Sequence, residues 1–373
     1  MSDRSLPPLP PLPEDEPPTV ERAASEPPTT EPPPRERRPD PRLQRRTWSA
    51  GHALIVCVLA LAIGLLLNAP GVHKAAYNKP DGWQRDVAIA FTGPLADMSH
   101  ALLLDRPRVA VQSVIGRSGA DEIDTEIALP TTPKPTSPTT PRKVAFTPTK
   151  RLRLWVAGDS LVIVPGFAVV RAAGASPVIE SVGGVDGRVA TGLTRPDVFN
   201  WFEHVRAQMK VLKPGAVVLG FGGNDDKAYM TGLPDGVTIG SYGGPAWRRE
   251  YARRVGGLMD LINRAGGFVV WIGLPQTESA EQTRRFDVVN AVVQKEALER
   301  EGRAAFIDTY TTFAGDDGGY TEYLSDPNGS LRKVRAGDGV HFEREGGDII
   351  AREVLKTLNR AYDLTSWRKK RAA

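Results

Sequence analysis

The sequence predicts an α/β domain built on a parallel five-stranded sheet, and three observations lead to this prediction. From residue 151 onward, short apolar runs alternate with longer stretches of helical periodicity, as in βα units whose strands pair in parallel. Glycine-containing turns follow several of the apolar runs, and open α/β sheets bind ligands at that edge. A proline-rich stretch precedes the alternation and indicates a domain boundary.

Composition limits the classes of protein to consider. The 373 residues, with 32 prolines and 37 glycines, exceed one typical domain and indicate non-globular appendages. The net charge of +4 depends on arginines before residue 50 and on a basic tail over residues 363–373. The chain shows no basic face interleaved with aromatic residues, so we expect no nucleic acid partner. Cys57 is the only cysteine, which excludes an internal disulfide.

The first 46 residues form a proline-rich tail that we expect to be disordered. Runs such as Leu6-Pro7-Pro8-Leu9-Pro10-Pro11 favour extended polyproline geometry and lack the apolar periodicity that would offset the entropy of ordering. A solvated tail is the simpler interpretation. Its Pro-x-x-Pro spacing leaves open a cytoplasmic partner.

An apolar stretch over residues 50–70 predicts a transmembrane signal anchor. Ala53 to Leu67 is apolar apart from Gly64, and the flanking residues bring the stretch to about the 20 needed to cross a bilayer. Arginines are concentrated before the stretch, which places the amino terminus in the cytoplasm and the rest of the chain on the other side of the inner (cell) membrane, periplasmic or otherwise extracytoplasmic. A cleaved signal peptide is the alternative, but its basic region would be abnormally long.

Two segments connect this predicted anchor to the sheet domain. Residues 71–129 contain helical patterns interrupted by Pro94 and Pro107, and they suit either a membrane-proximal stalk or a cap on the domain. Residues 130–150 are rich in proline and threonine and predict a semi-rigid linker.

The predicted domain covers residues 151–362. Its strands are expected over residues 152–157, 177–182, 216–221, 268–273 and 304–307, and its helices near residues 161–174, 196–211, 246–265, 281–301 and 344–361. Such a length is ample for one hydrophobic core.

A buried strand that ends in Gly158-Asp159-Ser160 predicts an exposed serine at the carboxyl edge of the sheet. A serine is a weak nucleophile unless the chain also supplies a base, an orienting acid and donors for an oxyanion. The Asp338-x-x-His341 turn offers both acid and base, because the aspartate can hold one ring nitrogen while the other faces the serine.

Two glycine-containing turns offer the donors. Gly222-Gly223-Asn224-Asp225 follows the third strand, and its asparagine could aim an amide inward. Gly183-Gly184-Val185-Asp186-Gly187 follows the second strand, and its backbone amides could line an anion pocket. Glycine turns and Asn-Asp pairs are common turn chemistry, so each block alone is weak evidence.

The four blocks in this order resemble the SGNH (GDSL) hydrolase superfamily, over roughly residues 151–362. The resemblance implies a three-layer flavodoxin-like fold, with Ser160 as nucleophile, His341 as general base and acid, and Asp338 as its orienting group. It also implies an oxyanion hole made by the Ser160 amide, Gly187 and Asn224. Asp159 and Asp225 resemble positions that brace the turns, so we expect them to be structural. The run from Ala190 to Trp201 is similar to a membrane-anchored bacterial branch of the superfamily.

This resemblance and the predicted location imply an extracytoplasmic serine esterase acting on O-acyl groups, in particular O-acetyl, of an envelope polysaccharide or glycan, or on a small ester. An O-acyltransferase with the same triad is the nearest alternative, and a catalytically idle, membrane-anchored binding module is a second. No zinc-ligand spacing lies near the site, so we expect no metal and no cofactor. Loops over residues 229–244 and 313–335, with Tyr320 and Tyr323, flank the predicted site, whereas Trp247 and Tyr251 are expected in the core.

Overall fold

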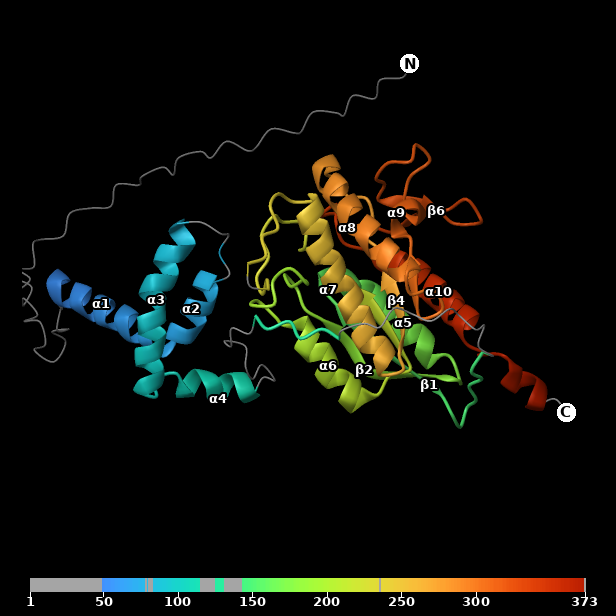
Figure 1. Cartoon of the computed structure of the whole chain (residues 1–373). Helices are drawn as coiled ribbons and strands as arrows, with labels where there is room; N and C mark the ends of the chain where they lie inside the picture. Colours follow the sequence, from blue (N-terminus) through green and yellow to red (C-terminus); the bar gives the residue numbers. More distant parts are fainter. Residues whose placement is uncertain are drawn as a thin grey trace, which may run out of the picture. The chain divides into compact units, whose positions relative to one another are not determined.

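The structure is a computed structural model that describes residues 49–77, 79, 83–114, 125–130, 143–234 and 236–371. The predicted tail over residues 1–46 lies outside this range, and so does the part of the predicted linker over residues 131–142. The described chain comprises a helical segment before residue 115 and a sheet domain (Figure 1).

Four helices form the helical segment: α1 (Ala50–Leu67), α2 (Ala69–Tyr77), α3 (Trp83–Ala101) and α4 (Arg106–Val114). The α1 helix has the length and hydropathy of a membrane span, and none of its residues is buried. It is therefore compatible with a single membrane anchor. The α2 helix packs against α3, where His73 Nδ1 lies 2.9 Å from Thr92 Oγ1.

The sheet domain confirms the predicted parallel five-stranded sheet. Its strands pair in the order β2-β1-β3-β4-β5, all in parallel. They are β1 (Leu152–Gly158), β2 (Ile179–Gly187), β3 (Ala216–Gly220), β4 (Phe268–Ile272) and β5 (Ala304–Ile307). Because the chain moves outward in one direction from β1 to β2 and in the other from β3 to β5, the order reverses between β1 and β3. Ligands bind at such a switch point in open α/β sheets.

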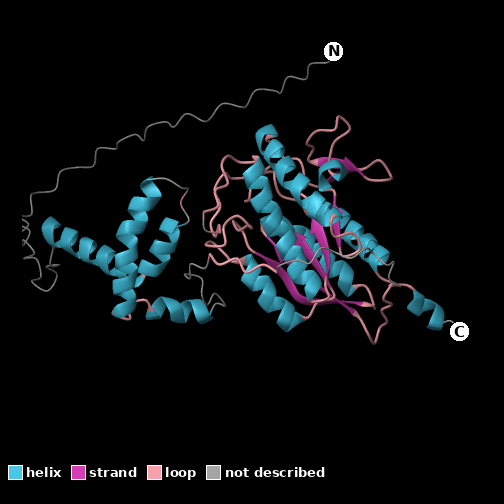
Figure 2. Cartoon of the chain, viewed as in Figure 1, coloured by secondary structure: helices cyan, strands magenta, loops and turns pink. Residues whose placement is uncertain are grey.

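Helices cover both faces of the sheet and complete three layers (Figure 2). The helices α5 (Ile163–Gly174) and α10 (Arg344–Ala361) pack on one face, and α6 (Trp201–Leu212), α7 (Pro245–Arg264) and α8 (Ala280–Leu298) contribute to the core on the other. Alternate residues of β1 point to opposite faces: Leu154 and Val156 join the first core, and Trp155 and Ala157 join the second. Burial on both faces explains the unbroken apolar runs of the sequence.

The β2 strand differs from its prediction. The strand continues to Gly187, and its register with β1 shifts between Leu154 and Val156. Gly183 and Gly184 lie within the strand at φ 72° and 64°, a left-handed backbone that favours glycine. These two glycines therefore form an irregularity inside a strand, not an anion pocket after it.

Local capping and turn chemistry explain further differences. The α6 helix begins at Trp201 because the Asn200 side chain accepts hydrogen bonds from the amides of Phe202 and Glu203. The predicted loop over residues 313–335 contains a hairpin of β6 (Tyr323–Ser325) and β7 (Leu331–Lys333), and it follows the short helix α9 (Thr309–Thr312). Within the described residues, the 3₁₀ helices are η2 (Ser160–Val162) and η3 (Ser366–Arg371).

Residues before the predicted domain boundary also pack on the sheet domain. The side chain of Leu129 lies against Gly257 of α7, and Asn200 donates a hydrogen bond of 2.8 Å to the carbonyl of Glu126. The Phe146 amide donates to the Asp363 carbonyl at 3.0 Å. The sheet domain therefore includes residues 125–130 and 143–150 in its packing.

Candidate active site

A tight turn after β1 presents Ser160. Gly158 ends the strand, and a Cβ atom there would lie only 2.0 Å from the Gly220 carbonyl oxygen of β3, so no larger residue fits this close approach. Asp159 caps the 3₁₀ helix η2 by accepting a hydrogen bond from the Leu161 amide at 2.9 Å. The serine thus sits at the amino end of η2, at the carboxyl edge of the sheet.

Three predicted residues from two distant stretches lie in one chain of hydrogen bonds. The Nε2 atom of His341 lies 2.8 Å from Ser160 Oγ, and its Nδ1 atom lies 2.6 Å from Asp338 Oδ2. Each ring nitrogen therefore has one partner, as in a nucleophile-base-acid triad. The other oxygen of Asp338 accepts the amides of Val340 and His341, both at 2.9 Å.

Hydrogen bonding keeps Asp338 ionised. Partial burial raises the pKa of its carboxyl, but the amides of His341 and Val340 and the His341 ring outweigh that effect and lower the pKa to about 2. A carboxylate at this position can orient the imidazole and stabilise an imidazolium.

The fully buried Arg335 supports the histidine turn and was missed by the sequence analysis. Its guanidinium donates hydrogen bonds to the carbonyls of Gln276 at 2.6 Å, Val340 at 2.7 Å and His341 at 3.3 Å. The guanidinium also lies 5.2 Å from the ring centroid of Tyr320. Arg335 precedes Asp338 by three residues, but nothing in the sequence distinguishes it from a surface arginine. Tyr323 is exposed on β6.

Asn224 lies beside the turn over residues 190–194. Its Nδ2 atom donates a hydrogen bond of 2.9 Å to the Thr191 carbonyl. An asparagine amide has two N–H donors, so one holds the loop and one is left for a ligand. Thr191, Gly192, Asn224 and Tyr229 line the same pocket of about 780 Å³, a size that suits a small-molecule site.

The predicted oxyanion donor Gly187 lies at the end of β2. Gly187 is the last residue of β2 and lies in register with Gly158, and the next amide, that of Arg188, donates to the Gly158 carbonyl at 2.9 Å. Gly187 therefore lies beside the strand whose end forms the serine turn. Gly192 lines the pocket next to Asn224, but its amide shares a trans peptide with the Thr191 carbonyl that faces Asn224, so this N–H points away from the Asn224 side chain.

Two buried carboxylates brace the turns around the serine and the asparagine. Asp159 accepts the amides of Gly222 and Gly223 at 3.1 and 2.9 Å, which ties the β1 turn to the β3 turn. Asp225 accepts the amides of Leu193 and Thr194, the Thr194 hydroxyl and the Tyr251 hydroxyl. The predicted core residues Trp247 and Tyr251 are fully buried and stacked 4.8 Å apart.

Asp159 makes the stability of the domain depend on pH. Burial is the largest effect and, with the nearby Asp225 carboxylate, raises the pKa of its carboxyl from 3.8 to about 7, although the amides of Leu161, Gly223 and Gly222 lower it. Between about pH 4 and pH 7 the folded state retains a proton that the unfolded chain releases, so the free energy of unfolding falls as pH rises. We expect the slope across this window to be smaller in Asp159→Asn, measured as urea midpoints against pH. An equal slope in both proteins would contradict the assignment.

A second buried arginine, Arg254 of α7, joins the loops beside the pocket. It donates to the carbonyls of Leu193 at 2.9 Å and Thr231 at 2.7 Å, and its Nε atom pairs with Glu250 at 2.7 Å. Burial lowers the pKa of Arg254, although the Glu250 carboxylate opposes that effect. An i, i+4 pair on a helix normally indicates a solvated face, so the sequence gives no sign of this role.

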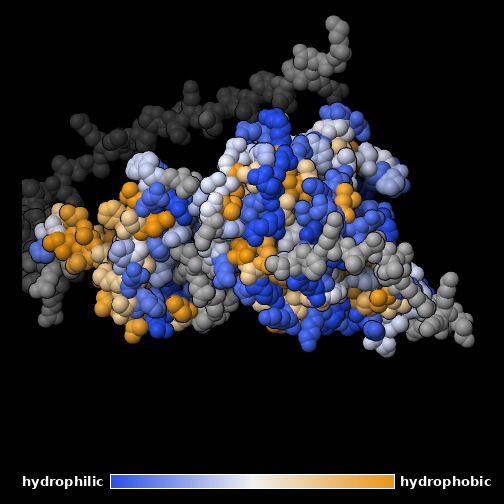
Figure 3. All heavy atoms as spheres, viewed as in Figure 1, coloured by the Kyte–Doolittle hydropathy of each residue, from blue (hydrophilic) through white to orange (hydrophobic). Residues whose placement is uncertain are grey.

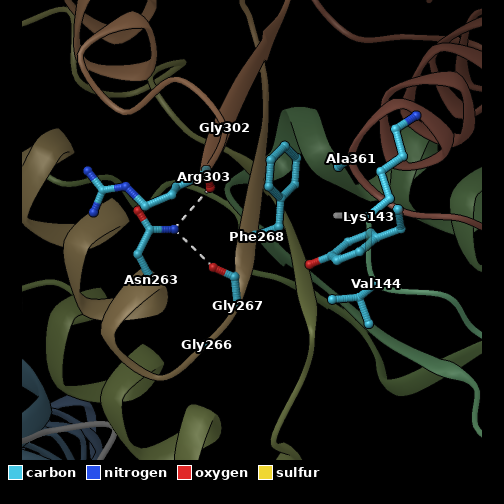
Figure 4. Close-up of a pocket in the computed structure, with 10 residues that line it drawn as sticks. Lys143, Val144, Asn263, Gly266, Gly267, Phe268, Gly302, Arg303 and Ala361 are labelled. Atoms are coloured by element: carbon cyan, nitrogen blue, oxygen red, sulfur yellow. Dashed lines mark hydrogen bonds between the residues drawn. The ribbon is translucent and has the colours of Figure 1, made fainter. Parts of the chain in front are cut away.

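A pocket at the opposite end of the sheet does not compete as a site. Lys143, Asn263, Phe268 and Tyr362 contribute to it, near the amino ends of β4 and β5 (Figure 4). The Asn263 amide donates to the carbonyls of Gly267 and Arg303 at 2.9 and 3.0 Å, which joins two turns. The pocket therefore lies at the edge of the sheet opposite the one that carries the Ser160 turn. Within the described part of the chain, no group of three His, Cys, Asp or Glu side chains could hold a metal ion.

The parallel five-stranded sheet with helices on both faces has the fold of the SGNH (GDSL) hydrolases, and the Ser160-His341-Asp338 contacts lie at its carboxyl edge. The chain belongs to the family described as protein of unknown function DUF459, whose model matches residues 153–357. A comparison with proteins of curated function found no match.

Several solved structures are similar to this chain. A GDSL-like lipase from Bacteroides thetaiotaomicron is 17% identical, with a TM-score of 0.39, over 58% of this chain and 93% of its own. A lipase/acylhydrolase from Enterococcus faecalis is 17% identical, with a TM-score of 0.38, over 55% and 94%. An acetyl xylan esterase from Geobacillus stearothermophilus is 17% identical, with a TM-score of 0.37, over 58% and 96%. At this identity the similarities do not assign an activity.

Proposed function

We propose that this chain is a serine esterase in which Ser160 attacks an ester carbonyl. The observation that carries the proposal is the chain of hydrogen bonds from Ser160 Oγ through the His341 ring to Asp338, at 2.8 and 2.6 Å. A nucleophile and base within hydrogen-bond reach, with the base oriented by a third group, is the arrangement that activates a serine.

The mechanism follows from the roles of these atoms. His341 Nε2 takes the proton of Ser160 Oγ as the oxygen attacks the ester carbonyl carbon, and a tetrahedral oxyanion forms. The imidazolium then gives that proton to the leaving alcohol, and an acyl-serine remains. Water attacks the acyl-serine with His341 again acting as the base, which releases the acid and restores the serine. Asp338 stays ionised throughout and stabilises the imidazolium.

Three donors are proposed for the oxyanion: the Ser160 amide, the second N–H of Asn224 and the Gly187 amide. Gly187 ends β2 in register with Gly158, next to the turn that presents Ser160. The bond from Asn224 to the Thr191 carbonyl holds the Asn224 side chain in place. Preorganised donors of this kind stabilise charge that develops only in the transition state.

We expect Asn224→Ala to lower kcat for ester hydrolysis by about 10²–10³-fold, the usual cost of removing one oxyanion donor. KM should change much less, because the lost interaction forms mainly in the transition state. Steady-state kinetics on an aryl acetate would measure both.

Asn200→Ala is the matched control. Asn200 caps α6, so its loss should cost about 1 kcal/mol of stability and leave kcat unchanged. A kcat for Asn224→Ala within about twofold of the wild-type value would contradict the assignment of Asn224, since one lost donor usually costs far more.

We propose O-acyl groups, in particular O-acetyl, on an envelope polysaccharide or glycan as the substrate, with α1 as an inner-membrane anchor and the domain outside the cytoplasm. The length and hydropathy of α1 support the anchor, and the arginines that precede it support the orientation. The pocket of about 780 Å³ beside Asn224 has room for a sugar-sized group.

A substrate series tests this proposal with the full chain. Aryl acetate, butyrate and octanoate esters are compared first, and acetate turnover above octanoate turnover is expected. Product analysis with O-acetylated glycan, in the presence of a hydroxyl acceptor, then distinguishes release of free acetate from transfer to the acceptor. A preference for octanoate would overturn the glycan substrate, and acetyl transfer would show an acyltransferase.

A further inference from the structure

The α3 helix exposes an apolar stripe that runs along its whole length. Its members recur every three or four residues and so lie on one helix face: Trp83, Val87, Phe91, Pro94 and Met98, continued by Leu102 in the turn after the helix. The Phe91 and Trp83 side chains are 77% and 73% exposed. The opposite face packs on α2 through Thr92, so the stripe is not the core side of the helix.

A hydrogen bond fixes the end of this helix to the end of the candidate membrane span. The fully buried Ser99 hydroxyl donates to the Leu66 carbonyl at 2.7 Å, and Leu66 lies in the last turn of α1. An 18-residue helix is about 27 Å long, close to the roughly 30 Å of a bilayer's hydrocarbon core. If α1 spans a membrane, Ser99 therefore lies at its surface, and so do the neighbouring Met98 and Leu102.

The residue types along the stripe are those of an interfacial helix. Tryptophan, phenylalanine and leucine are preferred where an amphipathic helix lies in the headgroup region. Leu103 adopts φ 57° and is 56% exposed, a costly backbone conformation for a leucine. Hydrophobic side chains gather over the helical segment around α1 and α3 (Figure 3), and isolated exposed apolar residues would not produce such a patch.

We propose that α3 lies along the extracytoplasmic surface of the bilayer, with its stripe from Trp83 to Leu102 inserted among the lipids. The occupant of this surface is the lipid itself, because the Ser99–Leu66 bond makes the stripe continuous with the membrane-facing surface of α1. This inference rests on the proposed membrane anchor. It assigns residues 83–102 as a second membrane contact.

The inference also limits the distance between the hydrolase domain and the membrane surface. Residues 115–124 connect Val114 of α4 to residues 125–130, which pack on the hydrolase domain. A connection of this length spans at most about 40 Å. The ester substrate is then expected close to the membrane surface.

Site-directed spin labelling of the full chain in phosphatidylethanolamine–phosphatidylglycerol vesicles tests this proposal. The native Cys57 in α1 is the only cysteine and is exposed, so a nitroxide there reports on the span itself. In a Cys57→Ala background, labels at Phe91→Cys and Met98→Cys report on the stripe. The matched controls are Asp86→Cys and Asp97→Cys, which are exposed polar positions on the same helix.

We expect the labels at 91 and 98 to collide with oxygen more than with a water-soluble nickel chelate, at a depth of about 5–10 Å below the headgroups. The labels at 86 and 97 should favour the nickel chelate. If the Cys57 label lies in lipid and the stripe labels lie in water, the inference fails while the anchor stands. Stripe labels shielded from both reagents would show a protein partner or a second copy and overturn it. A Cys57 label in water would overturn both this inference and the proposed membrane anchor. Esterase activity is measured in a separate experiment, so neither outcome depends on it.

Discussion

Ser160→Ala should lower kcat for hydrolysis of an aryl acetate by at least about 10⁴-fold, because no other group can form the acyl intermediate. His341→Ala should have a comparable effect, and the double variant should lose little more, because the two residues act as one unit. Initial rates at saturating substrate, with wild-type and variant chains prepared in parallel, measure these changes. The fold should not change, because the hydrogen bond of Ser160 Oγ is made to the His341 ring of the site itself.

Ser330→Ala is the matched control for this experiment. Ser330 is exposed in the turn between β6 and β7, and its replacement should leave both kcat and stability unchanged. Covalent labelling of wild-type Ser160 by a fluorophosphonate, absent from Ser160→Ala, would show directly that the serine is activated. Retained turnover in Ser160→Ala would refute the triad. A folded wild type without turnover or labelling would favour the idle binding module.

Asp225→Ala should lower the free energy of unfolding by about 3 kcal/mol or more, the largest stability effect expected from a single change near the site. The carboxylate accepts four hydrogen bonds, including those of the Leu193 and Thr194 amides and the Tyr251 hydroxyl. Its removal leaves these donors buried without a partner, at about 1–3 kcal/mol each before relaxation. Urea denaturation followed by circular dichroism measures the loss.

Two other variants show whether this loss comes from the hydrogen bonds. Tyr251→Phe removes one donor together with its bond, so the cost should be about 1 kcal/mol. Asp316→Ala alters an exposed aspartate and should stay within about 0.5 kcal/mol of the wild type. A similar small effect for Asp225→Ala would mean that water or a rearranged loop satisfies the donors, and that Asp225 does not hold the loop over residues 190–194.

Local sequence patterns were sufficient to predict those elements whose structure depends on residues close together in the chain. The strands β1, β3, β4 and β5 lie within one residue of their predicted bounds, because buried strands leave continuous apolar runs between turn residues. The spacing of Asp338 and His341 within one turn likewise follows from the local chain. Asn200 and the irregularity in β2 shifted the bounds of α6 and β2, because a cap and a change of register depend on details that periodicity does not record.

The sequence by itself determined the parallel α/β sheet, the candidate anchor helix and the residues that meet at Ser160, because each leaves a periodic or motif-sized signal in the chain. Only the tertiary structure decided which carbonyl holds the Asn224 side chain, since Thr191 precedes Asn224 by 33 residues. It also revealed Arg335 and Arg254, whose burial depends on carbonyls from distant loops. The position of the α3 stripe relative to the candidate membrane span follows from the Ser99–Leu66 bond, which joins residues 33 positions apart in the sequence. Contacts between distant segments leave no periodicity in a single sequence, so they can be identified only in the folded structure.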